Sequence, residues 1–205
     1  MGASMKSFNE HEVQSIIHAI FKKMGYRKPK FSMSAIMEKL FPQVEVVGGD
    51  SQGLHAKIEI YPKPLANGRR ALITYNEKAH ASTHRFSIAH ELAHFIFDAE
   101  YGAKTPPRVV CTLGAGEKPV SERRADYFAS ELLVPLWVLD EMVDFEIRVP
   151  ARDREAERAR DQKIQRLASG FDVSLACMKF RVFDLEHWRK MSRGGASARE
   201  RGVRS

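Results

Sequence analysis

The sequence His90-Glu91-Leu92-Ala93-His94 lies in an apolar run, with residues 86–89 before it and residues 95–97 after it. Two histidines at positions i and i+4 of a helix lie on one face, one turn apart. That spacing allows both imidazoles to bind one metal ion, while the glutamate beside the first histidine reaches a water on the same ion. A motif with three fixed positions also arises by chance, so its interpretation depends on the surrounding sequence.

The motif lies on a helix that we expect over residues 84–98, capped by Ser82 or Thr83. Apolar side chains cover most of its circumference, which predicts that the helix is buried. A narrow polar stripe interrupts this surface, and it consists of Ser87, His90, Glu91, His94 and Asp98. Because buried polar and charged groups need a partner or a metal, the stripe supports a site on this helix.

A small sheet is predicted before this helix. Strands are expected at residues 44–47, 54–61 and 71–75, and the second of them alternates so that one face is apolar. The loop over residues 62–69 contains prolines and an Asn-Gly pair, which favours an antiparallel connection between the second and third strands. With a further helix at residues 8–24, the predicted fold class is α+β, with a small antiparallel or mixed sheet packed on the buried helix.

The rest of the chain is predicted to be mainly helical. Residues 99–119 read as a long loop rich in glycine and proline, with a candidate strand at residues 109–111. Helices are expected at residues 121–134 and 151–166, and a last helix is capped by Ser174 and extends to about Trp188. The joint before this last helix resembles a helix-turn-helix.

The motif supplies two metal ligands, and a catalytic site needs a third. Glu122 opens the helix at residues 121–134, and Asp126 follows four residues later on the same face. Glu122 can then bind the metal, while Asp126 accepts a hydrogen bond from the free ring nitrogen of a liganding histidine, His90 in our interpretation. Glu131 is the rival ligand, but it lies about half a circle round the helix and has no acid at i+4.

Two histidines and one glutamate leave a fourth position for water, which is typical of catalytic rather than structural zinc. One Zn²⁺ ion is therefore predicted as cofactor, with Glu91 as the base that takes a proton from the water. Near the start of the helix, three residues are candidates for oxyanion or substrate contacts, namely Tyr75, His80 and His84. Cys111 is expected to be an ordinary loop cysteine.

These patterns predict a zinc metallopeptidase-like domain at residues 5–145, a helix-turn-helix-like segment at residues 151–188 and a disordered basic tail at residues 189–205. The tail carries +5 of the net charge of +7, and only Lys179 and Arg181 are basic in the would-be recognition helix. Direct DNA binding is therefore not expected. With no leader peptide, no apolar run of membrane-spanning length and two cysteines outside any CxxC pair, we expect a cytoplasmic protein.

Two stretches in this order resemble the ImmA/IrrE family of bacterial zinc metallopeptidases. They are residues 85–94, which end in the HExxH motif, and residues 122–135, which begin Glu-x-x-Ala-Asp and end Glu-Leu-Leu-Val-Pro. The strand at residues 72–76 resembles the family's usual lead-in to the helix. The sequence departs from the family pattern at Ala93, where glycine is common, and at Val134, where methionine is common.

The resemblance implies a site in which His90, His94 and Glu122 hold zinc and Glu91 acts as base. It also implies a typical substrate, a helix-turn-helix repressor of the XRE type, cut once to derepress stress-response or mobile-element genes. Since no clear N-terminal helix-turn-helix domain is present, repressor and peptidase would be separate chains. The alternative is a non-catalytic metal-containing regulator that binds DNA or a partner protein.

Overall fold

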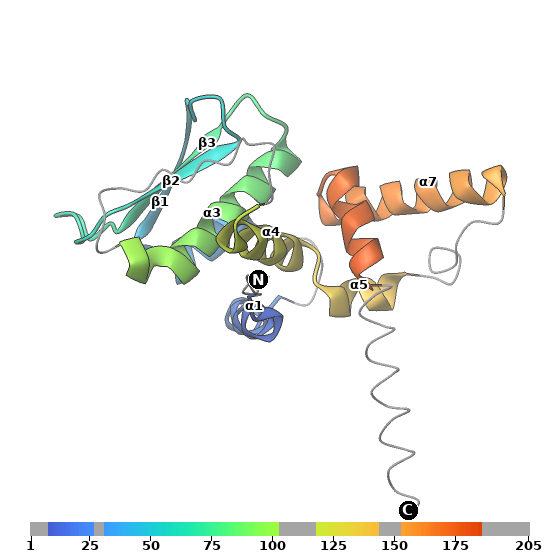
Figure 1. The fold of residues 1–205 in the computed structure, drawn as a ribbon, viewed down its shortest axis with the longest axis horizontal. Coiled ribbons are helices and arrows are strands. Elements are labelled where there is room, and N and C mark those ends of the chain that lie inside the picture. The colour runs from blue at the N-terminus through green and yellow to red at the C-terminus, as the bar shows by residue number, and fades with distance from the viewer. Residues whose placement is uncertain (1–7, 27–30, 103–117, 144–152, 186–205) are drawn as a thin grey trace, which may run out of the picture. The chain divides into compact units, whose positions relative to one another are not determined.

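The computed structural model (Figure 1) describes residues 8–26, 31–102, 118–143 and 153–185. These residues belong to two compact units, of which the first extends to Leu133 and the second begins at Val134. The candidate strand at residues 109–111, Cys111 and the basic tail lie outside the described residues. Within the described residues, no helix combines the length and the apolar character that crossing a membrane requires.

The first unit is built from helices and strands whose ends, apart from those of α3, lie close to the predicted ones. In chain order they are α1 (Glu10–Met24), α2 (Met33–Leu40), β1 (Val44–Gly49), β2 (Ala56–Ile60), β3 (Ala71–Asn76), α3 (Ala81–Gly102) and α4 (Val120–Leu133). The Asn9 side chain caps α1, which ends at Gly25 in the left-handed conformation with φ of 68°. Ser32 caps α2 by accepting a hydrogen bond from a backbone N–H.

The sheet is mixed, with β3 between β1 and β2. β2 pairs with β3 antiparallel, as the connecting loop predicts, whereas β1 pairs with β3 in parallel. The register places the buried side chains of all three strands on one face, and this set includes Val44, Ala56, Ile58, Ile60, Ala71 and Ile73. Because β2 and β3 pack against α3, the predicted α+β class with a sheet on the HExxH helix is confirmed.

The helix that carries the motif is longer than predicted at both ends. It begins at Ala81, and the His80 ring accepts a hydrogen bond from the backbone N–H of Ser82 at 3.2 Å. The prediction that Ser82 or Thr83 caps the helix is therefore wrong, because the ring nitrogen of His80 satisfies the orphan N–H instead. The helix continues to Gly102, into the segment that the glycine and proline content predicts as loop.

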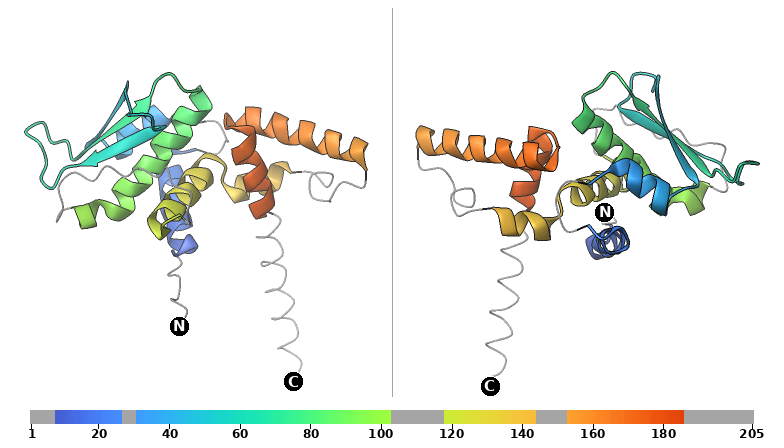
Figure 2. Two further views of the ribbon diagram at one scale, coloured as in Figure 1. Left: turned by 45° about the horizontal axis from the view of Figure 1, so that its top comes forward. Right: turned by 180° about the vertical axis from the view of Figure 1, so that it is seen from behind.

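In the first unit, α3 lies between the sheet and α4, and α1 packs against α4 (Figures 1 and 2). Four alanines are buried on the two central helices: Ala89, Ala93, Ala125 and Ala129. Small side chains let two helix backbones approach closely. A close approach matters here because α3 carries His90 and His94 and α4 carries Glu122. These three side chains form the metal-ligating group.

Enlarging Ala125 is expected to destabilise the first unit. Ala125 is buried, so Ala125→Leu adds three carbon atoms to a packed helix interface. Overpacking of this kind should lower the free energy of unfolding by about 1–3 kcal/mol. Denaturant unfolding measures the loss, with Ala19→Leu on the exposed face of α1 as control. A loss no larger than that of the control, within about 0.5 kcal/mol, would contradict the close packing of α3 and α4.

The second unit is helical in its described residues. It contains α5 (Leu136–Met142), α7 (Arg154–Phe171) and a helix over residues 175–185. Asp172 ends α7 in the left-handed conformation with φ of 56°, and Ser174 caps the following helix by accepting from the N–H of Cys177. The pair of helices matches the predicted helix-turn-helix-like arrangement. Its core includes Ile164, Ala168, Phe171, Met178, Val182 and Leu185.

Candidate metal centre

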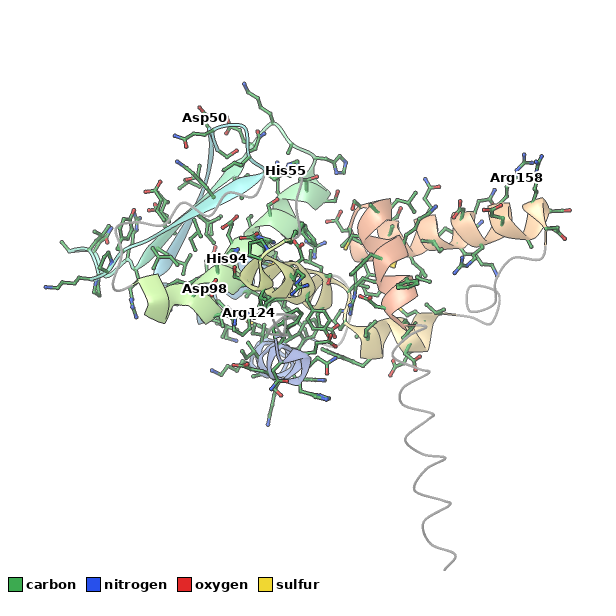
Figure 3. All side chains as sticks on the ribbon, viewed as in Figure 1. Asp50, His55, His94, Asp98, Arg124 and Arg158 are labelled. Atoms are coloured by element: carbon green, nitrogen blue, oxygen red, sulfur yellow. The ribbon has the colours of Figure 1, made fainter. Side chains whose placement is uncertain are left out.

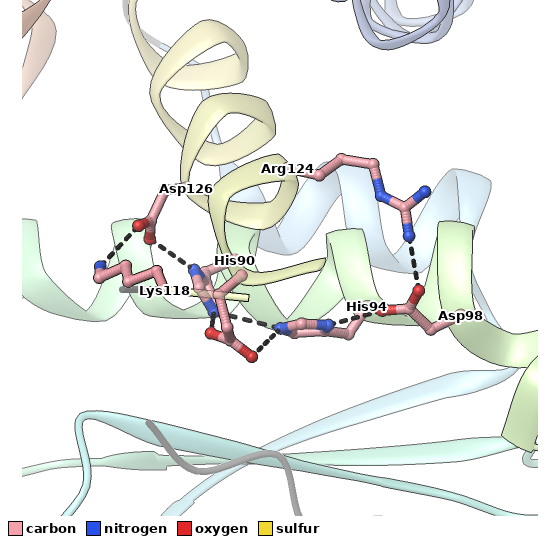
Figure 4. Close-up of polar contacts among 7 residues, drawn as sticks. His90, His94, Asp98, Lys118, Arg124 and Asp126 are labelled. Atoms are coloured by element: carbon pink, nitrogen blue, oxygen red, sulfur yellow. Dashed lines mark hydrogen bonds and ion pairs between the residues drawn. The ribbon is translucent and has the colours of Figure 1, made fainter. Parts of the chain in front are cut away.

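Two helices of the first unit bring three metal-ligating side chains together. His90 and His94 lie one turn apart on α3, and Glu122 lies in the first turn of α4. Glu122 also profits from the helix dipole at that position, which favours an acidic side chain. The side chains of His94 and Glu122 are almost fully buried, and that of His90 is exposed to 16%. Figure 4 shows the rings of His90 and His94 side by side.

The spacing of these side chains fits one tetrahedral metal ion. The Nε2 atoms of His90 and His94 lie 3.2 Å apart. Glu122 approaches the same two atoms, with Oε2 3.3 Å from His90 and Oε1 3.4 Å from His94. Tetrahedral zinc with bonds of about 2.0–2.2 Å separates its ligand atoms by about 3.3–3.6 Å. The three residues can therefore hold a metal ion.

Of the two glutamates that compete as third ligand, Glu122 is the one beside the histidines. Glu131 is fully buried on the same helix but is not part of the metal-ligating group. The nine-residue separation turns the two carboxylates to opposite sides of α4. Helical periodicity allows only one of the two at the site, and the acid at i+4, Asp126, favours Glu122.

Each metal-ligating histidine has a carboxylate on its other ring nitrogen. Asp126 contacts His90 Nδ1 at 3.0 Å, as the i+4 spacing from Glu122 predicts. Asp98 contacts His94 Nδ1 at 2.8 Å. In Figure 3, Asp98 lies next to His94 and Arg124 where α3 and α4 meet. Asp98 belongs to the polar stripe of the helix, and its i+4 spacing from His94 is the signal from which this contact could have been predicted.

Glu91 has the burial and the raised pKa that are typical of a general base. Its side chain is buried, and its Oε2 atom makes no hydrogen bond within the described part of the chain. Burial raises the pKa of the Glu91 carboxyl to about 7, against the lowering effect of His90 and His94. A carboxyl group with a pKa near neutrality exchanges protons readily at physiological pH.

Both metal-ligating histidines hold protons strongly in the metal-free protein. Burial alone would lower the pKa of His90, but hydrogen bonds to Asp126 and Glu122 outweigh it and raise the pKa to about 9. The pKa of His94 is raised for the same reason, with Asp98 and Glu122 outweighing its burial. At neutral pH a metal ion must therefore displace protons from this group.

Zinc affinity is expected to rise with pH up to about 9. Below the pKa of His90 the proton competes with the metal, and above it the ring is free to bind. One displaced proton gives about a tenfold gain in affinity per pH unit, and a contribution from His94 makes the dependence steeper. Competition with a chelator between pH 6.5 and 9, corrected for the chelator's own protonation, measures this slope. An affinity that does not change with pH over this range would contradict the protonated group.

Of the three further candidates, Tyr75 lies on β3, His80 directly precedes α3, and His84 lies near the start of α3. The rings of Tyr75 and His84 are 4.8 Å apart, and His84 Nε2 makes no hydrogen bond within the described residues. His84 lies seven residues before Glu91 and so on nearly the same helix face. Tyr75, His80 and His84 remain predicted oxyanion or substrate contacts, and the Nδ1 atom of His80 also caps α3.

A comparison with known protein families identifies a peptidase family whose match includes the residues of this site. A family model described as the IrrE N-terminal-like domain, Peptidase_M78, matches residues 49–183. The match covers well over half of the 205 residues and includes all members of the metal-ligating group. The resemblance carried by residues 85–94 and 122–135 is therefore confirmed. No curated protein matches the sequence significantly.

Proposed function

The chain belongs to the IrrE N-terminal-like family of peptidases, and on that basis we propose that it is a zinc-dependent endopeptidase of narrow specificity. The observation that carries the proposal is the convergence of His90, His94 and Glu122 beside the buried carboxyl of Glu91. This is the ligand set of zinc peptidases that leave one metal position open for catalysis.

The residues of the site have different roles in the proposed peptide hydrolysis. Zinc held there would polarise the scissile carbonyl and lower the pKa of a water molecule toward about 7. Glu91 accepts the proton of the attacking water and then delivers it to the nitrogen of the leaving amine. The burial of His94 and Glu122 keeps bulk water away from the charged groups, which strengthens their electrostatic effect.

The proposed substrate is a helix-turn-helix repressor of the XRE type, cut once to derepress stress-response or mobile-element genes. This assignment follows from the family resemblance. The sheet offers a way to hold an extended peptide, because β2 packs against α3 and has only β3 as neighbour within the described sheet. The free edge of such a strand pairs readily with the backbone of a bound segment.

A helix-turn-helix repressor of the XRE type encoded next to this gene would be the substrate to test. We expect that the purified zinc-loaded protein cuts this repressor at one peptide bond, and that a chelator stops the reaction and zinc restores it. Mass spectrometry of the fragments locates the cut. An intact repressor after prolonged incubation with protein of verified zinc content would contradict the proposed substrate.

A further inference from the structure

The second metal-ligating histidine is supported by an acidic residue on its own helix. Asp98 lies one turn after His94 on α3, and its Oδ2 atom is 2.8 Å from His94 Nδ1. Both side chains are shielded, with exposures of 1% for His94 and 16% for Asp98. A carboxylate can only accept a hydrogen bond, so the proton of the neutral imidazole stays on Nδ1. The lone pair is then on Nε2, the atom that faces His90 and Glu122.

Arg124 of α4 in turn holds Asp98 in place. Its other oxygen, Oδ1, accepts a hydrogen bond from an Arg124 guanidinium nitrogen at 2.6 Å. The guanidinium carbon lies 4.6 Å from the centre of the Phe97 ring, and that ring packs edge-on against Phe128 of α4. The charged hydrogen bond and the aromatic face together fix the position of the guanidinium group.

Arg124 lies two residues after Glu122 on α4, while Asp98 and His94 both belong to α3. The Asp98–Arg124 ion pair therefore links the two helices close to the place where Glu122 meets the histidines (Figure 4). The other histidine has a similar chain, in which Lys118 pairs with Asp126 at 2.7 Å, but the Lys118 side chain is exposed to 57%. An exposed ion pair of this kind contributes little to stability, so the Asp98–Arg124 pair holds its histidine more firmly than the Lys118–Asp126 pair does.

We propose that Asp98, held by Arg124, is a positioning residue for His94. It sets the tautomer and orientation of the ring, and the ion pair keeps α3 and α4 at the separation that a shared metal ion needs. The negative charge behind the ring also makes the coordinating nitrogen a stronger donor. This inference depends on the proposed metal site and assigns a role to two residues outside the ligand set.

Zinc affinity of the full chain, measured by competition with a chelator, tests the proposal. Asp98→Ala should weaken zinc binding by about 10- to 100-fold, as expected when a hydrogen-bond partner of a metal ligand is lost. Asp98→Asn keeps the size and one acceptor oxygen, so it should fall between Asp98→Ala and the wild type. Arg124→Met should weaken binding by a smaller factor, and Arg124→Lys, which keeps the charge, should restore most of the loss.

Asp161→Ala is the matched control, because Asp161 forms an ion pair with Lys179 at 2.9 Å in the other unit. It should leave zinc affinity unchanged. The visible absorption of the Co²⁺-loaded protein adds a readout of ligand geometry, which should change in the Asp98 variants and not in the control. Equal zinc affinities and equal cobalt spectra in the wild type and Asp98→Ala would overturn the positioning role of Asp98 and leave the proposed metal site standing. Failure of the wild type to bind either metal would overturn the proposed metal site as well.

Discussion

Replacing Glu91 by glutamine is expected to abolish peptide cleavage and to leave the fold and the zinc site intact. Glutamine has nearly the size of glutamate but cannot take a proton from water. Loss of general acid–base catalysis lowers the rate by about 10²- to 10⁴-fold. Because Glu91 is not a metal ligand in this geometry, the zinc content of the variant should equal that of the wild type.

The stability of the metal-free Glu91→Gln variant gives a second readout. The pKa of Glu91 is raised to about 7 from an ordinary value of 4.5, so ionisation of this carboxyl group disfavours the folded state as pH rises through that window. A neutral amide avoids this penalty, and the metal-free variant should melt no lower than the wild type at pH 8. Glu12→Gln, at an exposed position on α1, serves as the control for activity. Cleavage at the wild-type rate by a zinc-loaded Glu91→Gln protein would contradict the assigned base.

Replacing Glu122 by glutamine is expected to remove most of the zinc affinity. The carboxylate of Glu122 approaches both histidines, and it supplies the only negative charge in the metal-ligating group. The loss should exceed the roughly 10- to 100-fold effect of removing an outer hydrogen-bond partner. Chelator competition measures the affinity, and the rise in melting temperature on adding zinc provides an independent check.

Glu131→Gln is the matched control for Glu122→Gln, because it makes the same chemical change at a buried position of the same helix. It should keep zinc affinity, whatever its effect on stability. The opposite result, with zinc lost in Glu131→Gln and kept in Glu122→Gln, would show that the wrong glutamate has been assigned.

A regulator that binds DNA requires exposed cations on its recognition helix, and the helix at residues 175–185 offers few. Of the two cations in the helix at residues 175–185, Arg181 is fully buried and donates to the carbonyl of Val134 at 3.0 Å. Lys179 is paired with Asp161. Neutralisation of phosphates needs exposed cations, so these contacts favour a packing role for this helix.

The local features of the site could be predicted because they depend on helical periodicity. The i, i+4 spacing of His90 and His94 and that of Glu122 and Asp126 fix which side chains share a face, whatever the rest of the fold does. The same reasoning separates Glu122 from Glu131. The alternation in β2 likewise predicts its buried face correctly.

Features that depend on how elements cross could not be predicted in this way. Asp98 and Arg124 are 26 residues apart in sequence, and only the packing of α3 on α4 brings them together. The parallel pairing of β1 with β3 is similar, since an apolar strand pattern does not specify its neighbour. The cap supplied by His80 was missed for another reason: histidine is not among the residues that commonly cap helices.

The most direct test of the metal site is the metal content of protein purified without chelator, together with its X-ray absorption spectrum. The geometry predicts one zinc ion per chain, bound by two imidazole nitrogens and by oxygen, and a melting temperature that rises when zinc is added to the metal-free protein. Protein without bound metal, with a melting temperature that does not respond to zinc, would contradict the site formed by His90, His94 and Glu122.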